Sequence, residues 1–200
     1  MTAPSLLLAS ASTARADLLR RAGIAVAIEP ARVDESAIKA AMRAEGATAD
    51  RVAEALAEAK AQRVSGRHPG VLVLGADQML TCDGRWYDKP ADRAEARRHL
   101  QAMRGRAHAL ISALCIVRDG TRLWRHRETA TMWMRPFSDA FLDDYLDKAG
   151  PEVLESVGAY RLEGPGVQLF QRIDGDFFAI LGLPLLPLMD YLRDRGVVGT

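Results

Sequence analysis

The sequence predicts an α/β protein built on a mixed sheet with flanking helices. Segments with the apolar spacing of helices alternate along the chain with short apolar runs, which are typical of buried strands. Two Asp-Gly pairs, Asp83-Gly84 and Asp119-Gly120, separate apolar or alternating segments and therefore predict antiparallel hairpins. Because hairpins occur among the alternating elements, a mixed sheet is favoured over a purely parallel, doubly wound one.

The individual elements follow from apolar spacing and from the turn residues that bound each segment. Strands are expected at 5–9, 24–28, 71–74, 107–117 and 123–134, with short strands and Gly-rich turns over 157–180. Helices are expected between the N-cap Ser12 and Gly23 and over 36–45, 50–65, 91–103, 138–149 and 185–195.

Composition limits the classes of protein that this chain can belong to. Its 200 residues fit one domain, 1–200, or two small lobes sharing a core, and 48% hydrophobic residues exclude a disordered chain. Lysine and arginine total 27 against 26 acidic residues, which argues against an extended nucleic-acid-binding surface and leaves room for a local anionic pocket. No run of roughly eighteen apolar residues predicts a membrane helix. Cys82 and Cys115 lack metal-ligand or disulfide spacing, so we expect reduced thiols in a cytoplasmic protein.

Two acidic positions could serve chemistry or simply shape the chain. Asp77 follows the strand expected at 71–74, and open α/β sheets hold ligands beyond the carboxyl ends of their strands; a turn-forming Asp is the plain alternative. Glu35 follows Asp34 before a predicted helix, where acids stabilise the positive helix end. Glu35 could equally be an oxygen ligand of Mg²⁺, which is commonly held by one or two carboxylates and substrate phosphates.

Three basic segments could bind phosphate. Lys60 shares a helix face with Leu56, so its ammonium either reaches the surface at the helix end or projects into a cleft beside the core. Ser10-Ala11-Ser12 and Arg15 lie between the first strand and the first helix, where N–H groups and a guanidinium attract anions; an ordinary N-cap is the alternative. Lys89-Pro90 alone is typical of a surface turn.

Taken in order, these segments resemble the Maf family of nucleotide pyrophosphatases, and the match runs across nearly the whole chain. The motifs that carry it are Leu8-Ala9-Ser10-Ala11-Ser12 with Arg15, Val33-Asp34-Glu35, Lys60-Ala61, Gly75-Ala76-Asp77, Lys89-Pro90, Gly105 with His108, Gly158-Ala159-Tyr160, Ile173-Asp174-Gly175-Asp176 and Gly182-Leu183-Pro184. The resemblance implies a two-lobed fold like that of inosine triphosphate pyrophosphatases, with the active site in the cleft. It also implies hydrolysis of nucleoside triphosphates to the monophosphate and pyrophosphate, which keeps non-standard nucleotides out of nucleic acids.

The resemblance further implies roles for individual residues. Asp77 is expected as the catalytic carboxylate and shares a divalent metal ion, Mg²⁺ or Mn²⁺, with Glu35. A triphosphate carries about four negative charges, which cations and N–H donors must offset. The residues expected to hold it are Ser10, Ser12, Arg15, Lys60 and Lys89. A homodimer is common among relatives.

Departures from the family pattern bear on the same region. Ser12-Thr13-Ala14-Arg15 stands where the family usually has Ser-Pro-Arg-Arg, so one arginine is missing, and Asp88 stands where Gly usually precedes the Lys-Pro pair. Gln78 stands where the branch cleaving dTTP and UTP has Thr, and it resembles the branch acting on 7-methyl-GTP. Glu163-Gly164 and Leu169-Phe170 also look like that branch. We therefore expect Gln78 to take part in binding a modified or purine nucleotide.

Two other classes of function compete with an enzyme. The family has been linked to inhibition of septum formation, so the chain could be a nucleotide-binding regulator of cell division with little turnover. Asp77, Glu35 and Lys60 favour the enzyme, because a sensor need not keep a base and metal ligands. A structural or nucleic-acid-associated domain is the second alternative, and the balanced net charge speaks against it.

Overall fold

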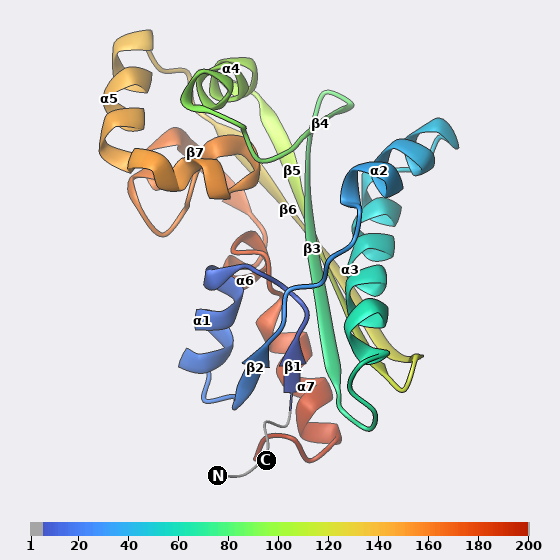
Figure 1. Cartoon of the computed structure of the whole chain (residues 1–200). Helices are drawn as coiled ribbons and strands as arrows, with labels where there is room; N and C mark the ends of the chain where they lie inside the picture. Colours follow the sequence, from blue (N-terminus) through green and yellow to red (C-terminus); the bar gives the residue numbers. More distant parts are fainter. Residues whose placement is uncertain (1–5, 200) are drawn as a thin grey trace.

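The computed structural model describes residues 6–199, and within them the chain forms a seven-stranded mixed sheet (Figure 1). The strand order is β2-β1-β3-β5-β6-β7, with β4 paired to β3. The strands are β1 (Leu6–Leu8), β2 (Val26–Ile28), β3 (Val73–Cys82), β4 (Arg85–Tyr87), β5 (Ala107–Arg118), β6 (Thr121–Met134) and β7 (Phe170–Asp174). The mixed sheet is confirmed; Ser5, at the start of the first expected strand, lies outside the described residues.

The sheet is parallel at one edge and antiparallel elsewhere. Strand β1 runs parallel to both β2 and β3, whereas β3, β5, β6 and β7 pair antiparallel in succession. The Asp83-Gly84 and Asp119-Gly120 turns join β3 to β4 and β5 to β6, and all four residues have positive φ. Both predicted hairpins are therefore confirmed, with the backbone that two-residue turns require.

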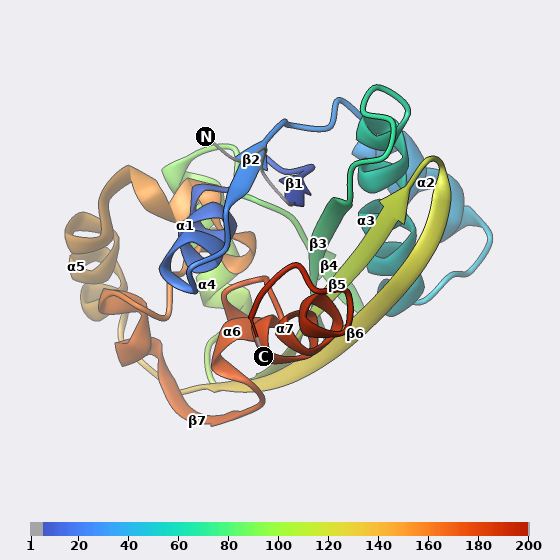
Figure 2. The same ribbon diagram turned by 90° about the horizontal axis from the view of Figure 1, so that it is seen from below.

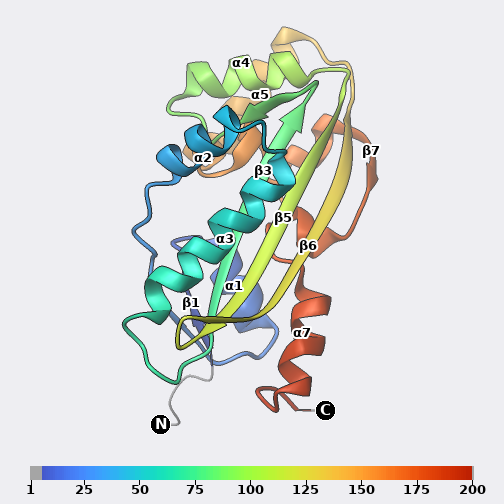
Figure 3. The same cartoon turned by 90° about the vertical axis from the view of Figure 1, so that its right-hand side faces the viewer.

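Helices cover both faces of this sheet (Figures 2 and 3). Helix α3 packs on one face, and α1 and α7 pack on the opposite face. The helices are α1 (Thr13–Arg21), α2 (Glu35–Ala44), α3 (Ala49–Ser65), α4 (Arg93–Met103), α5 (Asp139–Ala149), α6 (Phe177–Ile180) and α7 (Leu185–Asp194). None of the helices within 6–199 is long and apolar enough to cross a membrane.

Helix α3 approaches β3 closely because Gly75 has no side chain. A Cβ atom at Gly75 would lie 2.0 Å from the carbonyl oxygen of Ala57 and 2.9 Å from the amide nitrogen of Ala61. Ala57 and Ala61 are themselves small and fully buried. This contact brings the α3 backbone against the sheet beside Lys60, so the helix is fixed where its lysine leaves the core.

The long strands β3, β5 and β6 connect two lobes (Figure 1). The first lobe contains β1, β2, α1, α3 and α7; the second contains α4, α5, β7 and the 3₁₀ turns Gly150–Glu155, Val157–Ala159 and Pro165–Leu169. The short strands expected over 157–180 are therefore mostly wrong, because only β7 forms there. Gly158 and Ala159 have φ values of 78° and 60°, which no strand accommodates.

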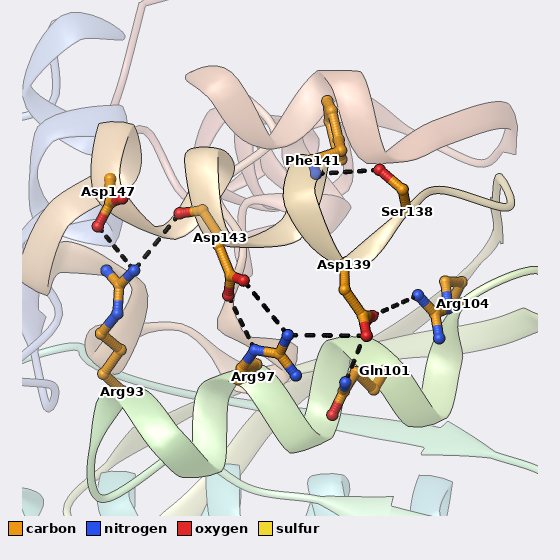
Figure 4. A network of polar contacts seen from close by, with 9 residues as sticks. All are labelled: Arg93, Arg97, Gln101, Arg104, Ser138, Asp139, Phe141, Asp143 and Asp147. Atoms are coloured by element: carbon orange, nitrogen blue, oxygen red, sulfur yellow. Dashed lines mark hydrogen bonds and ion pairs between the residues drawn. The ribbon is translucent and has the colours of Figure 1, made fainter.

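The second lobe is closed on its outer side by a row of ion pairs between α4 and α5 (Figure 4). Three arginines of α4 and its C-terminal end face three aspartates of α5 at 2.7–2.8 Å. The pairs are Arg93–Asp147, Arg97–Asp143 and Arg104–Asp139. These groups are largely exposed, so they fix the register of the two helices more than they add stability.

Candidate functional site

Asp77 lies in the middle of β3, and not beyond the end of a strand as expected. Strand β3 continues past Leu74 because β5 pairs with it as far as Thr81, with Asp77 opposite Ala113. The shorter strand β1 ends at Leu8, and the amide of Ala9 still donates to the carbonyl of Leu74 at 2.8 Å. Asp77 therefore sits just past the end of the parallel part of the sheet, where β1 has left its edge open.

Lys60 brings Asp77 and Glu35 together. Its Nζ lies 2.6 Å from Asp77 Oδ1 and 2.9 Å from Glu35 Oε1. The side chains of Lys60 and Asp77 are only 10% and 6% exposed. The structure therefore agrees with the second alternative for Lys60: its ammonium projects from α3 into the cleft and does not reach the surface. Asp34 serves as the N-cap of α2, and Glu35 in the first turn points to the lysine.

The pKa of Asp77 depends on two opposing effects, its burial and the two cations beside it. Burial raises the pKa of Asp77, while Lys60 and Arg15 oppose that rise. Oδ1 is bonded to Lys60, but Oδ2 is buried with no hydrogen-bond partner among the described residues. A buried oxygen without a partner is costly, so Oδ2 is suited to a cation, a water molecule or a substrate atom.

The loop after β1 is organised around Arg15. Ser12 is the N-cap of α1 and accepts from the Arg15 amide at 3.3 Å, as an ordinary N-cap would. The guanidinium donates through Nε to the carbonyl of Gly182 and through Nη1 to that of Ala76, both at 2.9 Å. Nη1 also lies 3.3 Å from Ser10 Oγ. Arg15 thus connects three segments, and among the described residues only its Nη2 has no hydrogen-bond partner.

Gln78 joins the sheet to the segment that contains α6. Its Nε2 lies 3.0 Å from Ser112 Oγ, 3.2 Å from the Ala179 carbonyl and 3.0 Å from the Ile180 carbonyl. The amide nitrogen is therefore fully engaged within the protein. The carbonyl oxygen is the group of Gln78 that a ligand in the cleft can use.

These residues line a cleft between the two lobes. Its main cavity, of about 460 Å³, is bounded by the loop after β1, by α2, α3 and β3, and by the turn at Ser156-Val157 in the second lobe. A smaller cavity of about 140 Å³ continues from it along Tyr160 and Leu181. All the residues singled out from the sequence lie on the main cavity: Ser10, Ser12, Arg15, Glu35, Lys60, Asp77, Gln78 and Lys89.

The sequence reasoning missed two charged residues of this cleft, Lys39 and Glu155. Lys39 lies four residues after Glu35 and so shares its helix face, a spacing that could have identified it. Its Nζ is 2.5 Å from Asp88 Oδ1. Asp88, the acid that departs from the family pattern, is thus paired with a lysine of α2. Glu155 ends a 3₁₀ turn, and no periodic pattern marks it.

The cleft carries as many cations as carboxylates. Its lining holds four of each, namely Arg15, Lys39, Lys60 and Lys89 against Glu35, Asp77, Asp88 and Glu155. Within 6–199 no group of three or more His, Cys, Asp or Glu side chains forms a ready metal cage. Glu35 and Asp77 are a two-carboxylate set, which suits an oxygen-loving ion that a ligand's phosphates would also hold.

The fold and the cleft together define an α/β protein with a polar cleft between two lobes, lined by cations and carboxylates. The chain belongs to the Maf family, because the family profile described as Maf-like protein matches residues 5–195. A nucleoside triphosphate pyrophosphatase from Paramagnetospirillum magneticum is 60% identical over 95% of this chain and 98% of its own. A 7-methyl-GTP pyrophosphatase from Rhizobium meliloti is 49% identical over 98% of both chains.

Among solved structures, a nucleoside-triphosphatase / dITP/XTP pyrophosphatase from Mycobacterium abscessus aligns with a TM-score of 0.42 at 16% identity. The alignment covers 96% of this chain and 93% of that chain.

Proposed function

We propose that this chain hydrolyses nucleoside triphosphates to the nucleoside monophosphate and pyrophosphate, and so removes unwanted nucleotides from the cytoplasmic pool. The observation that carries the proposal is the buried Asp77 beside Lys60 and Glu35 in the cleft, whose Oδ2 accepts no hydrogen bond from residues 6–199. Relatives that match this chain from end to end at about half identity or more, and are named as pyrophosphatases, support the same activity.

In this proposal Asp77 accepts the proton of the attacking water on Oδ2. The water oxygen forms a bond to phosphorus, the anhydride bond between the α- and β-phosphates breaks, and pyrophosphate carries away the electron pair. The ammonium of Lys60, hydrogen-bonded to Oδ1, opposes the rise in the Asp77 pKa that burial causes, and it orients the carboxylate. Arg15 Nη2, Lys89 and the hydroxyls of Ser10 and Ser12 would hold the phosphates.

Glu35 and Asp77 would hold a divalent ion, Mg²⁺ or Mn²⁺, which when bound neutralises phosphate charge. The equal numbers of cations and carboxylates in the cleft, four of each, support a need for this metal ion. A triphosphate with about four negative charges finds no net positive charge in the cleft to meet it, so extra cationic charge has to come with the substrate.

For the base, we propose a purine or a modified purine such as 7-methylguanine. The smaller cavity is lined by Gln78, whose carbonyl oxygen can accept a hydrogen bond from a purine base. Its charged residues balance, with Glu155 and Glu163 against Lys89 and Arg161, so the proposal rests on Gln78 and on the resemblance to the 7-methyl-GTP branch. The names of the relatives include both the general triphosphatase and the 7-methyl-GTP enzyme, so they support either preference.

Pyrophosphate release by the purified protein is the test. The nucleotide panel should contain the standard triphosphates, dITP and 7-methyl-GTP, each with Mg²⁺, with Mn²⁺ and with chelator. We expect release that depends on the metal and is fastest with 7-methyl-GTP. Binding of nucleotides without release, by folded protein with metal present, would favour a regulator of cell division instead. Sedimentation velocity of the same sample would test the expected homodimer.

A further inference from the structure

Lys39 pairs with an acid from another segment of the cleft lining. It projects from α2 one turn after Glu35, while Asp88 belongs to the loop that follows β4. Both line the main cavity, and their charged atoms are 2.5 Å apart. The Lys39 side chain is 20% exposed and that of Asp88 is 64% exposed. The lysine is therefore held in the cleft, whereas the acid can turn to solvent.

We propose that Lys39 is a further triphosphate-binding residue, and that Asp88 holds its ammonium in the free protein and yields it to the phosphates of the substrate. The inference rests on the proposed function for the nature of the ligand. The proposed function does not require Lys39, nor does it require that Lys39 leave Asp88 for the phosphates.

Two of the other three cations of the cleft are already held by protein groups, and the third, Lys89, is one that the proposed function places on the phosphates. Lys60 is already bonded to two carboxylates, and the Arg15 guanidinium is bonded to two backbone carbonyls. Within residues 6–199 Lys39 has one charged partner, and that partner is exposed. A compact ammonium on a flexible stem moves between oxygens more readily than a guanidinium fixed by its fork geometry.

The exchange favours substrates with several phosphates. Water solvates the exposed Asp88 carboxylate once it is released, and a polyphosphate offers Lys39 more negative charge than one carboxylate does. While Asp88 remains in place, its charge lies next to Lys89 and repels phosphate from this wall. A nucleoside monophosphate has a single phosphate and competes less well for the ammonium, so the pair discriminates between triphosphate and monophosphate.

The test compares Lys39→Gln, Asp88→Asn and the double variant with Lys148→Gln as the matched control. Lys148 also pairs with an acid, Asp144, but on the exposed face of α5. In Lys39→Gln we expect the KM for the triphosphate to rise about tenfold, which is about 1.4 kcal/mol, with kcat little changed. In Asp88→Asn we expect the KM to fall, because the competitor is gone. Adding Lys39→Gln to Asp88→Asn should raise the KM by at least the same tenfold, since without Asp88 the whole contribution of that lysine goes to the phosphates.

An unchanged KM in Lys39→Gln would overturn the proposal, as would a higher KM in Asp88→Asn. Calorimetric binding of inorganic pyrophosphate to each variant separates this inference from the proposed function. If the wild-type protein releases no pyrophosphate from any nucleotide, the proposed function fails, and the binding series still decides on Lys39. Weaker pyrophosphate binding in Lys39→Gln and unchanged binding in Lys148→Gln would uphold it; equal binding in all variants would refute it.

Discussion

Replacing Asp77 with Asn separates chemistry from folding in this protein. The change removes the carboxylate that we propose as proton acceptor and keeps the shape of the side chain. General-base catalysis commonly contributes 10²- to 10⁴-fold, so we expect turnover to fall about 1000-fold, or about 4 kcal/mol of activation free energy. Steady-state pyrophosphate release at saturating nucleotide measures it.

The effect on stability should be much smaller, because two changes oppose one another. Burial raises the pKa of Asp77, so its ionised form is disfavoured by the fold, and Asn removes that penalty. Lys60 loses one counterion but keeps Glu35 at 2.9 Å. We expect the free energy of unfolding to change by no more than about 1 kcal/mol. Urea unfolding monitored by circular dichroism gives this value.

The pH dependence provides a second check on the same residue. The folded state binds the Asp77 proton more tightly than the unfolded state does, since the folded pKa is the higher one. Wild-type stability relative to Asp77→Asn should therefore fall as pH rises from about 4 through the raised pKa.

The control for the turnover measurement is Asp190→Asn, a matched change at the surface of α7, which should leave turnover unaltered. A fully active Asp77→Asn protein would refute the assignment of the base.

Three further outcomes follow from the structure. Gly75→Ala should lower the free energy of unfolding by about 3 kcal/mol and weaken turnover, because its Cβ would push α3 and Lys60 off the sheet; urea unfolding and the same assay check both. Glu35→Gln should raise the Mg²⁺ concentration needed for half-maximal turnover about tenfold, which titrations of activity with Mg²⁺ and with Mn²⁺ would measure. An unchanged metal concentration for half-maximal turnover would exclude Glu35 as a metal ligand. Burial lowers the pKa of His108 to about 4, so only the unfolded state takes up its proton between about 6.5 and 4. Wild-type stability should therefore drop by about 2 kcal/mol between pH 7.5 and 5, and His108→Gln should remove most of that drop in parallel urea titrations.

The periodic parts of the fold could be predicted from sequence because they obey local rules. The Asp-Gly turns fixed both hairpins, and Ser12 and Ser138 cap helices as their type predicts. The segment 157–169 could not be predicted, since Gly158 and Ala159 adopt a backbone that only the surrounding second lobe imposes. In particular, the Tyr145 hydroxyl donates to the Ala159 carbonyl.

The candidate site could likewise be predicted only in part from the sequence. The residues that the sequence singles out all line the cleft, but the sequence does not predict what each one contacts. The sequence predicts Arg15 as a phosphate-binding residue, whereas its Nε and Nη1 already donate to the backbone carbonyls of Gly182 and Ala76. Those carbonyls are distant in sequence, so no local pattern encodes the contact. The Lys39–Asp88 pair was missed for the same reason, because 49 residues separate its partners.

The equal numbers of cations and carboxylates in the cleft also affect how a ligand arrives. Clefts lined by one sign of charge accelerate encounter with an oppositely charged ligand by on the order of 10- to 1000-fold. This cleft projects little net potential into solvent, so nucleotides reach it by ordinary diffusion, at a rate that varies little with ionic strength. Abundant small anions are not concentrated at its mouth either. Selection among anionic ligands should therefore take place after contact, through short-range fit in the cleft.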